Sequence, residues 1–357
     1  MHINILSLSE IDLWNKHLRG LPFNQHDVYY TPKYYSLFES YEDGKAQCFV
    51  FEKDGDIALY PFLLNSVNDL GYDLDQQYYD IQGAYGYNGV VSSSYQPNFI
   101  DSFYGAFNKW CQKNNIIAEF IRFNPYFMNH NFSKDYLQQL LNRRTVILDL
   151  NDSFDTIWEK AFSSKTRNMI RKALKNDYTT TIDNTDKGVR DFYNIYLNTM
   201  KGIESDSYYY FNLNMFQKML NEPSFHFLFV EDDEYSRVAT MILMIYGKYA
   251  HYHLSGRVIE KADNSVNNYL LYEAIKVAKH KGAEWFHFGG GNSIDENDSL
   301  FRFKKGFSKT YLDFYIGKKI HNQKVYSSIH EQWKKKHPNS FNQYKNLLLG
   351  YRNIKPN

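Results

Sequence analysis

The chain has 357 residues and a mass of 42.4 kDa, which is too long for one ordinary hydrophobic core and favours two domains. Its net charge of +1 and its pI of about 7.7 exclude a general polyanion-binding protein, so any phosphate contact must come from a local patch. The two cysteines, Cys48 and Cys111, have no paired spacing, which excludes a zinc motif and fits buried free thiols in a reducing compartment.

The N-terminus has neither a basic segment nor a long apolar segment, so we expect no signal peptide. No run approaches the roughly 18 apolar residues of a membrane-spanning helix, so we expect no transmembrane segment. These features predict a cytoplasmic protein and leave peripheral contact with a membrane open.

The first half of the chain predicts helices, then a run of strands, then a helix and a strand. Ser9 is expected to cap the first helix, and Pro32 occupies a tolerated first-turn position of the second. Asp54-Gly55 between two apolar runs predicts a hairpin. In chain order we expect helices over residues 10–20 and 32–41, strands over 46–52, 57–64 and 78–81, a helix over 98–114 and a strand over 117–123.

The second half predicts the same order of elements. A hairpin is expected around Asp232-Asp233-Glu234, and Gly282 is expected to end a long helix. The expected elements are a strand over 146–150, helices over 156–175, 189–199 and 213–220, strands over 225–231, 238–245 and 249–255, a helix over 267–281 and a strand over 285–288. The recurrence predicts a structural duplication, with a junction near residues 141–145 and a C-terminal helix and tail after about 322.

A triple glycine, Gly289-Gly290-Gly291, ends an apolar run, and Lys304 and Lys305 follow among aromatic residues. Glycine has no Cβ, so this backbone can turn sharply or lie close to a ligand. A lysine held against aromatic rings is partly desolvated, which strengthens its charge and suits chemistry through an oxyanion or a phosphate. In an extended segment Lys305 shares a face with Phe301 and Phe303, whereas in a helix Lys304 lies beside the apolar face. The sequence leaves both arrangements open.

Residues 165–175 contain five Lys and Arg side chains and no acidic one. Ile170 and Leu174 can face a core while the cations surround the rest of the helix, and Ser163 or Ser164 is placed to cap it. Arginine suits bidentate phosphate recognition, although most charge runs are solvated helix faces. The candidate ligands for a phosphate here are Arg167, Arg171 and Lys172.

Two further segments have a binding and a purely structural interpretation. In residues 85–89, glycines between Tyr85 and Tyr87 favour either a loop that lines a polar ligand or a turn between strands. In a regular strand His251 and His253 share one face, but no third ligand has supporting spacing. We therefore expect half-buried histidines and no metal site.

Several cofactor signatures are missing from the sequence. There is no Walker A loop, no Rossmann fingerprint and no Gly-x-Ser-x-Gly elbow. A helix N-terminus that holds a coenzyme A pyrophosphate usually follows a strand through a glycine-rich loop. The corresponding residues, 261–268, contain no glycine, which weakens a coenzyme A interpretation.

Taken in order over residues 25–320, the chain resembles the FemABX family of nonribosomal peptidyltransferases. The family combines two tandem GNAT-like domains. The resemblance therefore implies an α+β protein with two such domains, 1–144 and 145–322, each a mixed, mostly antiparallel sheet flanked by helices, followed by a C-terminal helix and tail, 323–357. The segments that resemble the family are residues 80–89, 120–125, 164–173, 208–211, 251–255, 289–291 and 303–307.

The resemblance implies an aminoacyltransferase of cell-wall biosynthesis. In the family an amine of a peptidoglycan precursor attacks the ester of an aminoacyl-tRNA, and a lysine of the Phe-Lys motif stabilises the oxyanion. That lysine corresponds to Lys304, with Lys305 as the adjacent rival. No bound cofactor is implied. The residues assigned to the substrates are Arg167, Arg171, Lys172, Tyr85, Tyr87, Arg122, Lys33, His253 and Gly290.

Two departures leave alternatives open. Between residues 176 and 208 there is no room for the long helical arm that some members use for tRNA contact. The tyrosine–glycine loop and the triple glycine also resemble a branch associated with surface polysaccharides. The alternatives are thus an acyl-CoA-dependent N-acyltransferase acting on a nucleotide-linked amino sugar, and a non-catalytic module that binds a glycan or peptide. A phosphate-bearing acceptor is expected in both enzymatic interpretations.

Overall fold

The computed structural model describes the whole chain except residues 42–43, 207–208, 221, 235, 260–262 and 355–357. Two compact units are present, and each is described by itself: unit 1 comprises residues 1–142 and 314–357, and unit 2 comprises residues 143–313. The chain enters unit 2 within strand β7 (Gln138–Asp149) and leaves it within strand β13 (Thr310–Ile320). Tyr208 and Lys261-Ala262 of the segments named above lie outside the described residues.

Unit 1 contains a mixed sheet with strand order β1-β2-β3-β4-β6-β13, in which β5 pairs with β3. β4 and β6 pair in parallel and the other neighbours are antiparallel. The hairpin predicted at Asp54-Gly55 forms, with Gly55 at φ +91°. The strands are β1 (His2–Ser7), β2 (Lys45–Lys53), β3 (Asp56–Ser66), β4 (Tyr79–Gln82), β5 (Val91–Ser92) and β6 (Ile116–Arg122).

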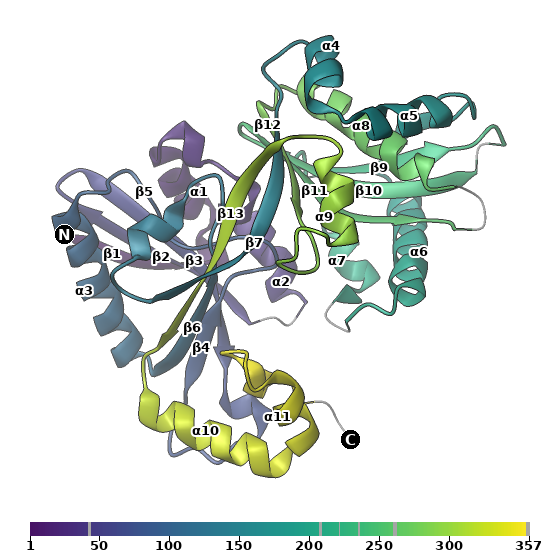
Figure 1. Cartoon of the computed structure of the whole chain (residues 1–357). Coiled ribbons are helices and arrows are strands. Elements are labelled where there is room, and N and C mark those ends of the chain that lie inside the picture. The colour runs from purple at the N-terminus through teal and green to yellow at the C-terminus, as the bar shows by residue number, and fades with distance from the viewer. Residues whose placement is uncertain (42–43, 207–208, 221, 235, 260–262, 355–357) are drawn as a thin grey trace. The chain divides into compact units, whose positions relative to one another are not determined.

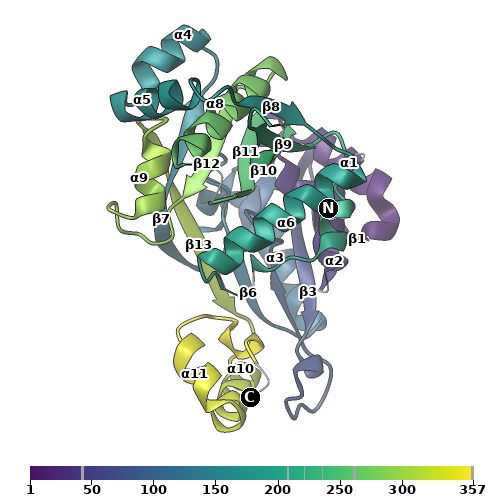
Figure 2. The same ribbon diagram turned by 90° about the vertical axis from the view of Figure 1, so that its right-hand side faces the viewer.

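Aromatic side chains form the core of unit 1. Phe99, Phe103 and Phe107 recur every fourth residue, so they share the face of α3 that packs on Phe49 and Phe51 of β2. Helices α10 and α11 lie beyond one end of β6 (Figure 2), with α10 packed against that strand. The helices are α1 (Ile11–Gly20), α2 (Pro32–Glu39), α3 (Pro97–Lys113), α10 (Gln323–Lys336) and α11 (Pro338–Tyr344).

Unit 2 contains a second mixed sheet, with strand order β7-β12-β11-β10-β9-β8. Only β11 and β12 pair in parallel among its described neighbours. Helix α8 connects these two strands, as a parallel pair requires. The remaining strands are β8 (Thr179–Ile182), β9 (Phe225–Glu231), β10 (Arg237–Tyr246), β11 (Tyr249–Arg257) and β12 (Trp285–Gly290).

Helices cover both faces of the sheet in unit 2. Figure 1 shows α6 on one side of β9–β11 and α5 and α8 on the other, and α8 contributes Leu270, Ala274 and Ile275 to the main core. The helices are α4 (Phe154–Thr156), α5 (Ser164–Ala173), α6 (Asp186–Gly202), α7 (Leu213–Gln217), α8 (Ser265–His280) and α9 (Ser299–Lys305). Among these described helices, none combines the length and apolarity that crossing a membrane requires.

The two units repeat one arrangement, which confirms the predicted α+β fold. In each, an antiparallel strand is followed by a helix and a parallel strand: β4-α3-β6 in unit 1 and β11-α8-β12 in unit 2. In each unit the parallel strand has an antiparallel neighbour on its other side: β13 pairs with β6, and β7 pairs with β12. The sequence predicted a second domain over 145–322 and a separate tail over 323–357. Because β13 pairs with β6, residues 314–357 belong to unit 1 instead.

Two predicted details differ from the structure, and one of the two caps predicted for the basic helix is confirmed. The helix expected over 156–175 is interrupted: a π-helix (Ile157–Ala161) ends at Phe162, whose extended backbone precedes α5. Ser163 then caps α5 by accepting a hydrogen bond from Thr166 N at 3.1 Å. Ser7, rather than Ser9, provides the capping box of the short 3-10 turn (Leu8–Glu10) before α1. The Ser7 side chain accepts a hydrogen bond from the backbone of this turn, and the Glu10 carboxylate accepts one from Ser7 N.

Candidate active site

The candidate site is centred on the point where β11 and β12 stop pairing. In the described residues their register pairs end at His251 and His287, although β11 continues to Arg257 and β12 to Gly290. We call this point the β11/β12 fork. The pairing of β11 with β10 skips His253, and the pairing of β12 with β7 skips Phe288, so each strand has one extra residue at that point. Such bulges redirect strands locally and are common beside active sites.

Helix α9 places one lysine inside unit 2 and the next at its surface. Asp298 caps this helix by accepting a hydrogen bond from Phe301 N at 2.9 Å. Lys304 is 7% exposed, whereas the Lys305 side chain is 33% exposed and lies 4.0 Å from a carboxylate oxygen of Glu296. The helical alternative is therefore the observed one, and Lys304 is the buried lysine of the pair.

The Lys304 amino group lies at the fork. Its Nζ donates a hydrogen bond of 2.6 Å to the carbonyl oxygen of Gly290, the last residue of β12. The same Nζ lies 5.6 Å from the centroid of the Tyr252 ring on β11. A Cβ at Gly289 would come within 3.4 Å of Nζ, and Gly289 has φ +77°. Glycine therefore permits this turn and keeps the space beside the amine open.

Burial controls the charge of Lys304. Loss of hydration lowers its pKa to about 7, with Asp298 opposing this shift and Arg143 adding to it. Burial also lowers the pKa of His253 to about 3 and that of His287 well below its usual value. Burial raises the pKa of Tyr252, whose hydroxyl is hydrogen-bonded to Ser255 Oγ. Near neutral pH the fork thus holds a neutral His253, a neutral His287, a neutral Tyr252 and a lysine close to its titration midpoint.

Helix α5 is joined to α9 through its first turn. Ser163 N donates a hydrogen bond of 2.8 Å to the carbonyl of Gly306, directly after α9. A Cβ at Gly306 would collide with Thr166 Oγ1 of α5, so this glycine allows the two segments to touch. The position of the basic helix is therefore coupled to the helix that presents Lys304.

The predicted phosphate ligands on α5 have different environments. Arg167 Nη1 donates to the carbonyls of Trp158, Glu159 and Phe162, at 3.2, 3.0 and 2.7 Å, and so caps the preceding π-helix. This structural engagement was not foreseen from the sequence. Arg171 is exposed and lies 5.5 Å over the Trp158 ring, with one hydrogen bond to Asn168.

Lys172 of α5 pairs with Asp263, at 2.5 Å. Asp263 precedes α8, and its Oδ1 accepts a hydrogen bond of 2.7 Å from Ser265 N in the first turn of that helix. The hydrogen bond from Lys172, followed by that from Ser265, lowers the pKa of Asp263 to about 2. The start of α8 consequently holds a carboxylate that is ionised at neutral pH.

The candidates in unit 1 surround the tyrosine–glycine loop. Arg122 donates to the carbonyls of Gly86, Gly83 and Ala84, at 3.1, 2.9 and 2.8 Å, and thereby braces the loop from inside. The Tyr85 carbonyl accepts a hydrogen bond of 2.5 Å from Tyr34.

Tyr87 of this loop packs edge-on against the rings of Tyr29 and Phe314. Lys33 lies half-buried on α2. These contacts account for the order of the loop. Ligand binding by the four unit 1 candidates, Tyr85, Tyr87, Arg122 and Lys33, stays a prediction.

The histidines of β11 are arranged differently from the expectation. The bulge at His253 interrupts the alternation that was expected to place His251 and His253 on one face. Instead, His251 lies opposite His287 in the parallel pair, and their ring centroids are 5.6 Å apart. In the described part of the chain, no group of three His, Cys, Asp or Glu side chains is placed to hold a metal ion.

Sequence reasoning did not assign a role to two residues beside Lys304. Tyr252 lies under the amine, and its position in the middle of the His-Tyr-His segment was the available signal. Arg143 donates a hydrogen bond of 2.5 Å to the carbonyl of Gly291 and also influences Lys304 electrostatically. No local pattern marks Arg143, because its contact spans 148 positions in the sequence.

Comparison with known proteins agrees with this architecture. Residues 160–305 match the model of the acetyltransferase (GNAT) domain family, which supports an acyltransferase. The crystal structure of FemX superposes with a TM-score of 0.69 at 14% identity, over 92% of this chain and 99% of that one. The chain has the fold of FemX. No curated protein matches the sequence.

Two further solved structures share this fold. L-PGS from Bacillus licheniformis has a TM-score of 0.56 and 14% identity, over 89% of this chain and 94% of that one. A C-terminal domain named for lysylphosphatidylglycerol synthetase, from Agrobacterium fabrum, has a TM-score of 0.53 and 12% identity, over 89% and 95% of the two chains. The predicted tandem GNAT-like fold is thus confirmed, and the identities are too low to transfer a substrate.

Proposed function

We propose that this protein is an aminoacyltransferase that moves an amino acid from aminoacyl-tRNA to an amine of a peptidoglycan precursor in the cytoplasm. The observation that carries this proposal is the buried amino group of Lys304 at the β11/β12 fork, bonded to the Gly290 carbonyl. In acyl transfer, charge develops on the carbonyl oxygen, and a donor group in a water-poor site stabilises it. The similarity to FemX favours the cell-wall acceptor.

The start of α8 supports a donor without coenzyme A. In GNAT-like folds this helix begins where a coenzyme A pyrophosphate binds, because helix N-termini attract anions. Here Asp263 already accepts the Ser265 N–H at that end, and its carboxylate would repel a pyrophosphate. The described residues before the helix, Asp263 and Asn264, include no glycine that would let a phosphate approach the backbone.

The exposed cations of α5 are suited to a phosphate on either substrate. Arg171 and Lys172 are exposed, and the helix that carries them is fixed to the segment after α9. The acceptor would then bear phosphate as a nucleotide- or lipid-linked precursor. The fold shared with lysylphosphatidylglycerol synthetase keeps a lipid-linked acceptor, and hence contact with a membrane surface, within the proposal.

An acyl-CoA-dependent N-acyltransferase acting on a nucleotide-linked amino sugar is the second candidate. The match of residues 160–305 to an acetyltransferase family favours it. It requires coenzyme A to bind despite the Asp263 carboxylate, so it makes the opposite prediction about the donor. A non-catalytic binding module would instead transfer nothing from either donor.

A donor comparison tests the proposal. The purified protein is incubated with a UDP-linked muropeptide or an amino-sugar nucleotide as acceptor, and with a mixture of aminoacyl-tRNAs or acetyl-CoA as donor, and the acceptor mass is followed. We expect a mass increase of one aminoacyl group from tRNA, and Lys304→Met should lower the rate by about 10²–10³-fold. Transfer from acetyl-CoA to an amino-sugar nucleotide, with none from tRNA, would favour the second candidate. Ligand-induced thermal stabilisation without any transfer would favour the binding module.

A further inference from the structure

The proposed reaction requires a group that removes a proton from the attacking amine. A protonated amine has no lone pair, and the attacking nitrogen must lose a proton once it has bonded to the carbonyl carbon. We propose that Lys304 is this proton acceptor: its buried amine begins the cycle neutral at the β11/β12 fork and becomes the cation beside the oxyanion only after taking the proton. This inference rests on the proposed acyl transfer and adds the starting state and the direction of proton movement.

The hydrogen bonding of Lys304 fits a neutral amine. An ammonium group has three N–H donors. In the described structure Nζ makes one hydrogen bond, to Gly290 O at 2.6 Å, and forms no ion pair with a carboxylate. A buried ammonium would leave two donors without a protein acceptor among the described residues, at a considerable desolvation cost. The neutral amine uses one N–H for Gly290 and keeps a lone pair.

Four groups of the described residues, Asp298, Arg143, Tyr252 and His287, are near Lys304, and none of the four is suited to act as the base. Asp298, before α9, is engaged as the helix cap and also accepts a hydrogen bond from Asn292 N at 3.1 Å. Arg143 of β7 is cationic, and its charge adds to the larger effect of burial in lowering the pKa of Lys304. Tyr252 of β11 has a raised pKa and is protonated at neutral pH. His287 of β12 has a strongly lowered pKa, which makes it a poor proton acceptor.

The glycine at position 289 places no side chain beside Nζ. Gly289 is the residue whose Cβ would lie 3.4 Å from Nζ, and its φ of +77° disfavours any residue with a side chain. The adjacent ends of β11 and β12 no longer pair with each other. A substrate amine can thus approach Lys304 from the side that the glycine leaves open.

Every proton is accounted for over one catalytic cycle. The substrate nitrogen forms a bond to the ester carbonyl carbon, and its proton moves to the lone pair of Lys304 Nζ. The resulting ammonium stabilises the oxyanion. When the C–O bond to the tRNA ribose breaks, the ammonium gives its proton to the leaving oxygen. The products are an amide and a hydroxyl, and Lys304 returns to the neutral amine without any further reactant.

The two roles of Lys304 predict opposite pH dependences. We would measure kcat/KM for transfer from aminoacyl-tRNA to a UDP-linked muropeptide between pH 5.5 and 8.5 as test conditions. A proton acceptor predicts activity that rises through about pH 7, the pKa of Lys304. A lysine that must be cationic from the start predicts activity that falls through the same range. The acceptor amine titrates near pH 10 if it is a lysyl side chain, so its neutral fraction rises about tenfold per pH unit across this range, and kcat/KM is expressed per neutral acceptor amine before the two profiles are compared.

Variants separate these roles further. Lys304→Arg keeps a permanent cation but cannot accept a proton, so we expect at least a 10²-fold loss and no limb near pH 7. The exposed Lys309→Arg should keep the wild-type profile. A falling limb, or Lys304→Arg activity within a few-fold of wild type, would overturn the acceptor role while leaving acyl transfer intact. Absence of transfer by the wild type with every amine acceptor would overturn the proposed function and this role together.

Discussion

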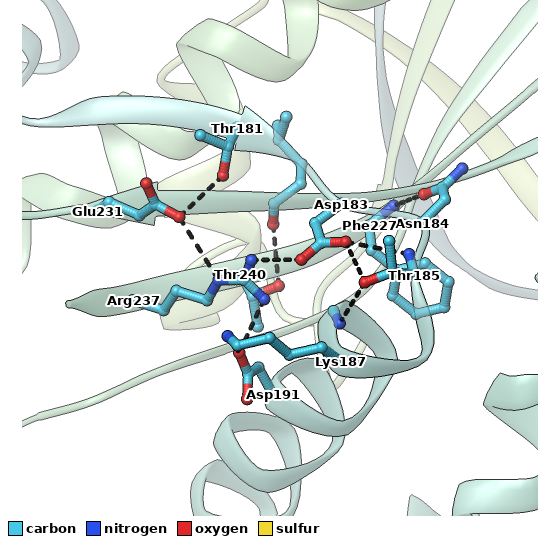
Figure 3. A network of polar contacts seen from close by, with 12 residues as sticks. Thr181, Asp183, Asn184, Thr185, Lys187, Asp191, Phe227, Glu231, Arg237 and Thr240 are labelled. Atoms are coloured by element: carbon cyan, nitrogen blue, oxygen red, sulfur yellow. Dashed lines mark hydrogen bonds and ion pairs between the residues drawn. The ribbon is translucent and has the colours of Figure 1, made fainter. Parts of the chain in front are cut away.

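Two basic side chains of unit 2, the half-buried Arg237 and the buried Lys304, differ in their acidic partners. Arg237 at the start of β10 bonds to Asp183 at 2.5 Å and Asp191 at 2.9 Å and lies 3.5 Å from Glu231 (Figure 3). Its guanidinium also lies 4.0 Å over the Phe229 ring. Lys304 has one carbonyl and an aromatic ring. The first site surrounds a cation with carboxylates, whereas no carboxylate among the described residues forms an ion pair with the Lys304 amine.

The difference distinguishes a charge that stabilises the fold, at Arg237, from an amine that is available for proton transfer, at Lys304. Burial alone would raise the pKa of Asp183, but hydrogen bonds from Arg237 and Thr185 lower it overall. The network thus keeps both partners ionised and ties together β9, β10, α6 and the end of β8. At Lys304, no ion pair within the described part of the chain offsets burial, and the amine can gain or lose a proton near neutral pH.

The largest expected effect follows from removing the structural cation. Arg237→Leu leaves three carboxylates close together without their partner, and we expect the free energy of unfolding to fall by roughly 2–4 kcal/mol. Urea denaturation at pH 7 measures this. The matched control is Arg190→Leu, because Arg190 pairs with Asp186 on the exposed face of α6, where solvent screens the pair and its loss should leave stability almost unchanged. Equal losses in the two variants would contradict a structural role for the network.

Removing the Lys304 amine should have the opposite effect on the free energy of unfolding and stabilise the protein. Its pKa is about 7 in the folded protein and near 10.4 when unfolded, so the unfolded chain binds more protons between these values and stability rises with pH across that window. We expect Lys304→Met to raise the free energy of unfolding by on the order of 2 kcal/mol at pH 6–7.

The gain should shrink as the pH rises toward 10. Urea denaturation at several pH values measures it, and Lys309→Met, at an exposed position, provides the control. A destabilised Lys304→Met protein, or a gain independent of pH, would mean that Lys304 is not held against its hydration preference.

The sequence predicted the repeated element order because local signals specify it. The Asp54-Gly55 turn, the apolar spacing of α3 and α8, and the glycine after α8 each depend on near neighbours. Strand β13 was missed, and with it the assignment of the C-terminal residues to unit 1. Its partner β6 lies about two hundred positions earlier, so no local pattern indicates the pairing.

The candidate site was predictable in its residue types but not in its geometry. The Gly-Gly-Gly and Lys-Lys segments lie together, with Lys304 Nζ bonded to Gly290 O, whereas the choice of Lys304 as the buried lysine depended on whether residues 299–305 are helical. The bulge at His253 and the capping role of Arg167 also depend on tertiary contacts. Charge in a sequence indicates that a cation is present, and only its neighbours determine what that cation does.

The same distinction applies on α5. Arg171 is exposed beside Trp158, whereas Arg167 caps the preceding π-helix. We expect Arg171→Ala to raise the acceptor KM by about 3–10-fold, equivalent to roughly 1 kcal/mol, and to weaken its dependence on salt. Arg167→Ala should mainly lower stability. Steady-state kinetics at two salt concentrations, with thermal unfolding of both variants, measure the contrast. An unchanged KM in Arg171→Ala would remove this residue from the phosphate site.

The smallest expected effect concerns the ion pair between Lys172 and Asp263. Their side chains are 60% and 42% exposed, so solvent screens the pair, and Lys172→Met should cost no more than about 0.5 kcal/mol. The Asp263 pKa is lowered to about 2, so this contribution is present above the unfolded value near 3.9 and is lost as the pH falls through 2. NMR titration of the Asp263 carboxyl measures it directly, and in Lys172→Met we expect the pKa to move back toward 3.9.

Asp263 is ionised at neutral pH in either case, so its repulsion of a pyrophosphate does not depend on the ion pair. If that repulsion excludes coenzyme A, Lys172→Met should still fail to bind it, and Asp263→Asn should bind it more strongly than wild type because the amide is uncharged. Calorimetric titration with coenzyme A measures both variants. Equal and strong binding by wild type and Asp263→Asn would show that the carboxylate does not determine the donor.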